Sequence, residues 1–182
     1  MAEEDTLKER LARHRRMAES YHHAYEKRAV KDGATYEDWK FADHAVYWSP
    51  YFGDQLIDLT ENPMTVQQSA SMEALTYSMS FPDWGPLGFK CWPSDIGFVM
   101  QSHFGGHDHS GKLMDFYVYG FVETNENYEI TRWETHVSPE YNDFLDAALG
   151  VHGPFKHGAD EYMAAVAKKM KECGIDPASL KR

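Results

Sequence analysis

Apolar residues recur at steps of three and four along the N-terminal segment, and this spacing predicts an amphipathic helix. Thr6 and Glu9 have the spacing of a capping box at its start, and Gly33 ends it. The face that the spacing brings together consists of Leu7, Leu11, His14, Ala18, His22, Tyr25 and Ala29. We expect a short second helix from Thr35 to Phe41, a strand at residues 45–50 and a third helix at residues 65–79.

The pattern changes to strands between residues 89 and 137. Four segments rich in β-branched and aromatic residues, 89–92, 96–104, 112–124 and 128–137, are separated by short turns, as in an antiparallel meander. Ser138 and Pro139 then begin a helix that Gly150 ends, and a last amphipathic helix is closed by Gly174. This order predicts an α+β fold, a cone-shaped curved antiparallel sheet closed by N-terminal helices.

Length and composition favour a single domain over residues 1–182, with a C-terminal helical extension, 139–182, that packs on the barrel or on a neighbouring subunit. A mean hydropathy of -0.62 leaves no membrane span, and the N-terminus lacks the apolar centre of a secretion signal. Two cysteines are too few for a disulfide framework, so we expect a cytoplasmic protein. The net charge of -11 would repel nucleic acid.

The segment "HFGGHDHSG", residues 103–111, raises the question of a metal site. A metal would need three convergent ligands with supporting hydrogen bonds, whereas His107, Asp108 and His109 are consecutive residues at an expected hairpin tip. The chain has no glycine-rich phosphate loop, Gly-x-Ser-x-Gly elbow or Cys-x-x-Cys pair. We therefore expect neither a metal nor a cofactor.

Three fragments occur in a characteristic order: "FADHAVYWSP", then "FPD" before a strand, then "HFGGHDHSG" before the strands that lead to "YEITRWETHVSPEY". Over roughly residues 5–150 the chain resembles the SnoaL-like polyketide cyclases and the wider nuclear transport factor 2-like superfamily. The resemblance implies a cone with a deep apolar cavity, usually in dimers or higher oligomers. The superfamily includes ketosteroid isomerase, lignin diarylpropane lyases and non-catalytic dioxygenase subunits, so the fold does not name the reaction.

The resemblance also suggests catalytic residues. Tyr25 stands 18 residues before the aspartate of "FADH", the spacing of the isomerase's oxyanion-donating tyrosine, although a core tyrosine is an equal alternative. His22, one turn earlier, is a candidate acid or base, or else a buried core histidine. The isomerase's general base falls on Ser49 and its second acid on Gly120, so that route is not carried over.

Further candidates lie near the expected cavity. Asp83 either braces the loop or catalyses, and Lys90 is either a desolvated base or phenolate-binding cation, or a lysine that points out from an edge strand. If the chain is aligned in the same way with ketosteroid isomerase, side chains of the last two strands alternate between the cavity and the outer face. The inward positions are then Met114, Phe116, Val118, Gly120, Val122, Thr131, Trp133, Thr135 and Val137. The opposite set forms an outer polar face, unless the register is shifted by one residue. The expected substrate-binding residues are Tyr47, Ser49, Trp84, Trp92, Phe116 and Trp133.

These features favour a cofactor-independent lyase that acts on a bulky oxygenated aromatic molecule. The lignin lyases suggest deformylation of a lignin-derived diarylpropane or phenylcoumaran to a stilbene. The alternatives are a polyketide cyclase, an aromatic dehydratase or isomerase, a non-catalytic subunit of an aromatic-ring dioxygenase, and a ligand-binding module without turnover. The expected partners are an aromatic small molecule and further copies of the chain, in a homodimer or homotrimer, with neither nucleic acid nor membrane.

Overall fold

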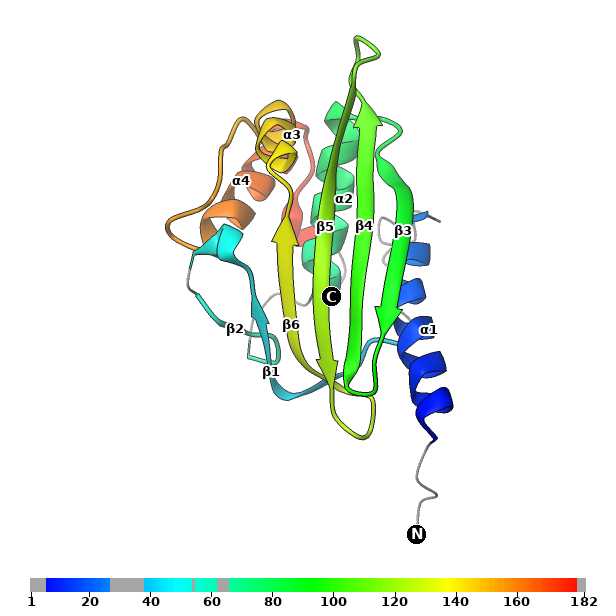
Figure 1. The fold of residues 1–182 in the computed structure, drawn as a ribbon. Helices are drawn as coiled ribbons and strands as arrows, with labels where there is room; N and C mark the ends of the chain where they lie inside the picture. Colours follow the sequence, from blue (N-terminus) through cyan, green and yellow to red (C-terminus); the bar gives the residue numbers. More distant parts are fainter. Residues whose placement is uncertain (1–5, 27–37, 54, 62–65, 180–182) are drawn as a thin grey trace.

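A computed structural model describes residues 6–26, 38–53, 55–61 and 66–179 (Figure 1). Its strands are β1 (Phe41–Trp48), β2 (Ile57–Asp58), β3 (Gly85–Pro93), β4 (Gly97–His107), β5 (Leu113–Thr124) and β6 (Ile130–Val137). Its helices are α1 (Leu7–Glu26), α2 (Val66–Ser80), α3 (Glu140–Leu149), α4 (Ala159–Glu172) and the short 3-10 helices η1 (Pro50–Phe52) and η2 (Pro177–Ser179). None of the described helices is long and apolar enough to cross a membrane.

The six strands form one sheet in the order β2-β1-β6-β5-β4-β3. Strands β3 to β6 are the antiparallel meander that the sequence predicts, with β4 and β5 paired from His107 and Leu113 to Gly97 and Glu123. The pairing of β1 with β6 is parallel, so the sheet is mixed rather than wholly antiparallel. This is possible because β2, α2 and strands β3 to β5 lie between β1 and β6 in the sequence. No tight turn therefore forces β1 and β6 to run in opposite directions.

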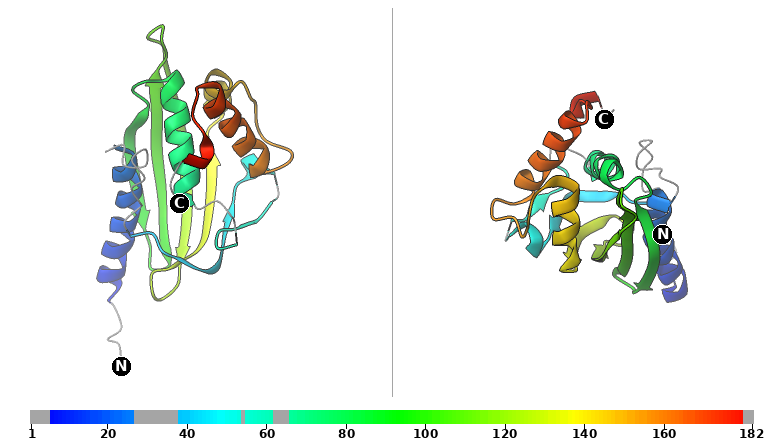
Figure 2. Two further views of the ribbon diagram at one scale, coloured as in Figure 1. Left: turned by 180° about the vertical axis from the view of Figure 1, so that it is seen from behind. Right: turned by 90° about the horizontal axis from the view of Figure 1, so that it is seen from above.

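The helices cover one face of the curved sheet, and the other face is uncovered in the described part of the chain (Figures 1 and 2). Helix α1 packs against β3 and β4, α3 packs against β5, and α2 contacts both α3 and α4. The prediction of an α+β fold with a curved sheet closed by helices is therefore confirmed. The interior between sheet and helices is strongly aromatic.

Helix α1 begins at the predicted capping box and is joined to the sheet by His14. The capping box forms, since the amide of Thr6 donates to Glu9 Oε2 at 2.8 Å and the amide of Glu9 donates to Thr6 Oγ1 at 3.3 Å. His14 is fully buried, with Nδ1 at 2.7 Å from the carbonyl of Ser94 and Nε2 at 2.8 Å from the hydroxyl of Thr124. It thus ties the helix to the β3–β4 turn and to the end of β5.

Three local predictions need correction. Phe41 begins β1 instead of ending a short helix, and residues 38–40 before it are not helical. Residues 35–37 of that expected helix, and Gly33, lie outside the described residues. The strand expected at residues 89–92 is longer, because β3 begins at Gly85 and ends at Pro93. Strand β4 continues through Gly105 and Gly106, so the turn of the histidine hairpin begins only at residue 108.

The two glycines serve close packing rather than a turn. A Cβ on Gly105 would lie 2.7 Å from Cβ of Asp115, and one on Gly106 would lie 2.9 Å from Cβ of Phe81 and from Cα of Trp84. Any larger residue at these positions would push the neighbouring backbone away, which explains how a Gly-Gly pair can lie inside a strand.

Candidate active site

A cavity of about 290 Å³ lies between the sheet and the helices. Its wall is mainly aromatic and includes seven of the eleven tyrosines of the chain. The residues of the wall are Tyr21, Tyr25, Tyr47, Ser49, Tyr51, Phe52, Ile57, Leu59, Ser69, Ala70, Glu73, Tyr77, Trp84, Phe104, Phe116, Val118, Trp133, Thr135, Val137, Tyr141, Ala159, Asp160, Tyr162 and Met163. A concave, apolar space with a few polar groups is typical of a small-molecule site.

Glu73 is the only charged residue of helix α2, and it faces this cavity. Burial raises the pKa of its carboxyl to about 7, because the aromatic surroundings disfavour the charged form. A hydrogen bond from the Tyr162 hydroxyl favours the carboxylate and limits that rise. Near neutral pH the group is therefore present in both forms, so it can donate or accept a proton.

Three tyrosine hydroxyls meet next to Glu73. Tyr77 follows it by one helical turn on α2, whereas Tyr141 comes from α3 and Tyr162 from α4. The hydroxyl of Tyr77 lies 2.9 Å from that of Tyr141 and forms a second hydrogen bond with that of Tyr162. Burial raises the pKa of all three, so they remain neutral phenols that can donate hydrogen bonds.

Most of the expected substrate-binding residues line the cavity. Tyr47, Ser49, Trp84, Phe116 and Trp133 all contribute to its wall. The amide of Tyr51 donates to Ser49 Oγ, which caps η1. Of the expected catalytic residues, Tyr25 reaches the cavity, where its buried ring packs edge-on against Trp84 and Phe104.

The predicted inward-facing phase of β5 and β6 is confirmed for the residues that reach the cavity. Phe116 and Val118 of β5, and Trp133, Thr135 and Val137 of β6, point into the cavity. The intervening Tyr117 and Phe121 are exposed on the uncovered face. The register shifted by one residue, which would have placed the polar set inside, is therefore wrong.

Four other candidates are not brought to the cavity wall. Alternation along β3 turns Phe89 inward, towards α1, and leaves Lys90 exposed and Trp92 53% exposed. His22 stacks on Phe89 with ring centroids 4.9 Å apart, and burial lowers its pKa. Asp83 is exposed and accepts hydrogen bonds at 2.7 Å from the amide and Nδ1 of His107, so it braces the β4 end.

Sequence reasoning missed Glu73 and the tyrosines Tyr77, Tyr141 and Tyr162. One signal was available, because Glu73 is a lone charge in fifteen helical residues and Tyr77 lies on the same face at i+4. Tyr141 and Tyr162 carry no local signal, since only the packing of α3 and α4 brings them to Glu73.

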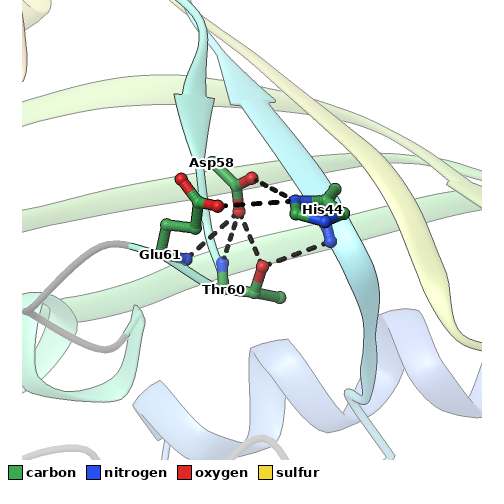
Figure 3. Close-up of polar contacts among 4 residues, drawn as sticks. All are labelled: His44, Asp58, Thr60 and Glu61. Atoms are coloured by element: carbon green, nitrogen blue, oxygen red, sulfur yellow. Dashed lines mark hydrogen bonds and ion pairs between the residues drawn. The ribbon is translucent and has the colours of Figure 1, made fainter.

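A second polar cluster, formed by His44, Asp58, Thr60 and Glu61, lies at the β2 edge of the sheet (Figure 3). None of these residues lines the cavity. His44 Nδ1 is 3.0 Å from Asp58 Oδ2 and 3.8 Å from Glu61 Oε1. The other oxygen of Asp58 accepts from the amide and hydroxyl of Thr60 at 2.9 and 2.7 Å, and from the amide of Glu61. The hydrogen bond with Asp58 raises the pKa of His44. Imidazole and carboxylates of this kind can bind a divalent cation, although His44 and Glu61 are exposed.

In the histidine-rich hairpin, His103 and His107 each form a hydrogen bond with a different carboxylate. His103 Nε2 lies 2.6 Å from Asp115 Oδ2 on the outer face, whereas His107 pairs with Asp83. Asp108 instead accepts hydrogen bonds from the turn itself, from Ser110 and Lys112. The hairpin therefore uses its acidic groups to fix its own conformation.

Comparison with known proteins finds no matching family model and no matching curated protein. Several solved structures are similar. A putative SnoaL-like polyketide cyclase from Jannaschia has a TM-score of 0.46 and 10% identity, covering 74% of this chain and 92% of the other. A steroid delta-isomerase from Pseudomonas aeruginosa has a TM-score of 0.45 and 12% identity, covering 89% and 91%.

A phenazine biosynthesis-related protein, also from Pseudomonas aeruginosa, has a TM-score of 0.45 and 13% identity, covering 79% of this chain and 91% of the other. Other similar structures are described as NTF2-like proteins.

Proposed function

We propose that the protein is an enzyme that catalyses proton transfer on an oxygenated aromatic small molecule bound in the cavity. The observation that carries this proposal is Glu73, a carboxyl whose pKa is raised to about 7 in an aromatic wall beside three tyrosine hydroxyls. A general acid–base is most effective when its pKa is near the working pH, and neutral phenols can donate to a developing oxygen charge.

The shape and lining of the cavity support an aromatic substrate. Rings from α1, β1, β4, β5 and β6 surround it, and such walls favour flat ligands through stacked and edge-on contacts. Its volume of about 290 Å³ is near the lower end of small-molecule sites, roughly 300–1,000 Å³. The expected ligand is therefore compact, with one or two aromatic rings.

Within this class we propose a lyase reaction that needs no cofactor, deformylation of a lignin-derived diarylpropane or phenylcoumaran. In a diarylpropane, protonated Glu73 gives its proton to a benzylic hydroxyl, which leaves as water, while the para-phenol gives its proton to solvent water and becomes a quinone methide. The Glu73 carboxylate then takes the hydroxymethyl O–H proton. The carbon–carbon bond breaks, formaldehyde leaves, and the electron pair returns to the ring to give a stilbene phenolate. Tyr25 or the hydroxyl group of Tyr77 would donate to that phenolate.

The test is turnover of phenolic diarylpropanes and phenylcoumarans, followed by product mass and formaldehyde release. Wild type is compared with Glu73→Gln, and Lys90→Ala is the control because Lys90 is exposed outside the cavity. Loss of acid–base catalysis should lower kcat by about a hundredfold or more in Glu73→Gln and leave Lys90→Ala near wild type. Full activity of Glu73→Gln would exclude this mechanism. A cyclase or isomerase would give products without formaldehyde, and a dioxygenase subunit would give none.

We further propose that the chain forms a homo-oligomer through the uncovered face of its sheet. Leu113, Tyr117 and Phe121, which share one face of β5 at every fourth residue, are 43%, 37% and 44% exposed there. Exposed apolar groups in a row are typical of a protein interface. Light scattering of wild type and Phe121→Glu would show the change from an oligomer to a monomer, and a monomeric wild type would refute the proposal.

A further inference from the structure

The cavity contains buried hydrogen-bond donors that have no partner among the described residues. Nε1 of Trp84, Nε1 of Trp133 and Oγ1 of Thr135 are all inaccessible to solvent and unpaired there. The three residues are 4%, 9% and 8% exposed, and all of them line the cavity. A buried polar group without a partner is costly, and most such groups in proteins are satisfied. Their presence around one cavity therefore needs an explanation.

Two of these donors belong to residues of β6 that lie beside a glycine of β5. Gly120 of β5 is directly paired with Thr135 of β6, and a Cβ on Gly120 would lie 3.6 Å from Trp133 Nε1. The indole therefore leans across β5 towards the position that faces Thr135. The same Cβ would lie 2.6 Å from Met100 Cε, so the Met100 side chain occupies the space into which a side chain at Gly120 would point. Tyr47 is near Thr135 too, without the geometry of a hydrogen bond.

The charged groups of the cavity wall disfavour an anionic ligand. Among the described residues that line the cavity, Glu73 and Asp160 are acidic and none is Lys, Arg or His. A carboxylate or phosphate on a ligand would meet acidic groups and no cation, so an anionic ligand would be poorly bound. A neutral oxygen acceptor, by contrast, would satisfy the indole N–H and the threonine hydroxyl at once.

We propose that Trp133 and Thr135 form a donor pair that recognises a neutral acceptor oxygen of the substrate, such as a ketone, and that the site rejects carboxylates. This inference deepens the proposed function, on which it rests only in placing the substrate in the cavity. It names the substrate class as an uncharged aromatic molecule with a carbonyl or ether oxygen remote from any ionised group.

The test uses three probes with one phenol ring: para-hydroxyacetophenone, para-ethylphenol and para-hydroxybenzoate. Their affinities for wild type are measured by calorimetry at neutral pH, where the phenol groups are protonated and only the benzoate is ionised. The ketone should bind roughly tenfold more tightly than the ethylphenol, because two hydrogen bonds are gained, and the benzoate more weakly than both. Equal affinity of ketone and ethylphenol, tight binding of the benzoate, or no measurable binding of the ketone would overturn the proposal.

The donor pair is tested with Thr135→Val and Trp133→Phe, which remove the hydroxyl and the indole N–H. In each variant, the ratio of the ketone affinity to the ethylphenol affinity should fall by about threefold or more. The affinity of Thr135→Val for ethylphenol itself should not change. Thr131→Val is the matched control, because Thr131 is on the same strand but donates to the carbonyl of Glu123 outside the cavity. Retention of the full advantage in both variants would refute the pair.

Folding gives an independent measurement. Thr135→Val replaces an unpaired buried hydroxyl with a methyl group of similar volume, so its thermal midpoint should equal or exceed that of wild type. A clear loss of stability would mean that the hydroxyl is already satisfied within the protein, against the proposal. Glu73→Gln should keep the ketone preference while losing turnover, which separates failure of the substrate class from failure of the proposed reaction.

Discussion

The raised pKa of Glu73 predicts a change in stability with pH that can be measured without any substrate. The carboxyl has an ordinary pKa of 4.5 in the unfolded chain and a pKa of about 7 in the folded protein. Between these values the folded state holds one more proton than the unfolded state. The stability that this carboxyl contributes is therefore complete below about pH 4.5 and is lost as the pH rises through 7.

The size of the loss follows from the two pKa values. At about 1.4 kcal/mol for each pH unit, the difference corresponds to roughly 3 kcal/mol in the free energy of unfolding. Glu73 is only partly buried and faces a cavity, so screening by water reduces this to about 2–3 kcal/mol. Glu73→Gln does not titrate, and its stability relative to wild type should increase by that amount from pH about 5 to about 8.

Urea unfolding of wild type and Glu73→Gln across this range measures the difference directly, since the other titrating groups contribute equally to both proteins. Glu126→Gln, at an exposed position of the β5–β6 turn, is the control and should follow the wild type. A constant difference between Glu73→Gln and wild type at all pH values would show that the carboxyl is not desolvated. The proposed acid–base role would then lose its physical basis.

Three further predictions concern other parts of the fold. Burial lowers the pKa of His14 below 6.5, so wild type should lose stability relative to His14→Gln as the pH falls below 6.5, as measured by thermal unfolding. Gly97→Ala should destabilise by about 3 kcal/mol or more, because its Cβ would lie 1.9 Å from a carbonyl oxygen of β5. In the control Gly88→Ala, the new Cβ would lie 3.8 Å from Cβ of His103, an ordinary contact. This substitution should lower the free energy of unfolding by about 1 kcal/mol at most. Tyr162→Phe removes a hydrogen bond to the Glu73 carboxylate, so the pH–rate profile should move to higher pH.

The sheet was predictable from sequence because its signal is local. Phe116 and Val118 alternate with the exposed Tyr117 along β5, and this period of two gives both the strand and the face that lines the cavity. Helix α1 was predictable for the same reason, from a period of three to four residues and its capping box. The parallel pairing of β1 with β6 depends on contacts between distant segments, and no local pattern predicts it.

The chemistry of the site was harder to predict than its wall. Lys90 drew attention as a charge between two apolar neighbours, yet the pleat of β3 points it to solvent. Glu73 drew none, because a single glutamate in a helix is common on protein surfaces. Its unusual properties come from burial beside Tyr141 and Tyr162, which belong to helices far along the chain. Desolvation is a property of the packed structure, so no spacing in the sequence can reveal it.

The position of Tyr162 on α4 has a consequence for the order in which the protein matures. The sheet and α1 to α3 precede α4 along the chain, whereas Tyr162, Asp160 and Met163 of α4 complete the cavity wall. During synthesis the N-terminal part emerges first, so a nascent chain can form its sheet before it has a complete cavity. Under the proposed function, the acid–base site is therefore complete only when α4 docks and Tyr162 reaches Glu73.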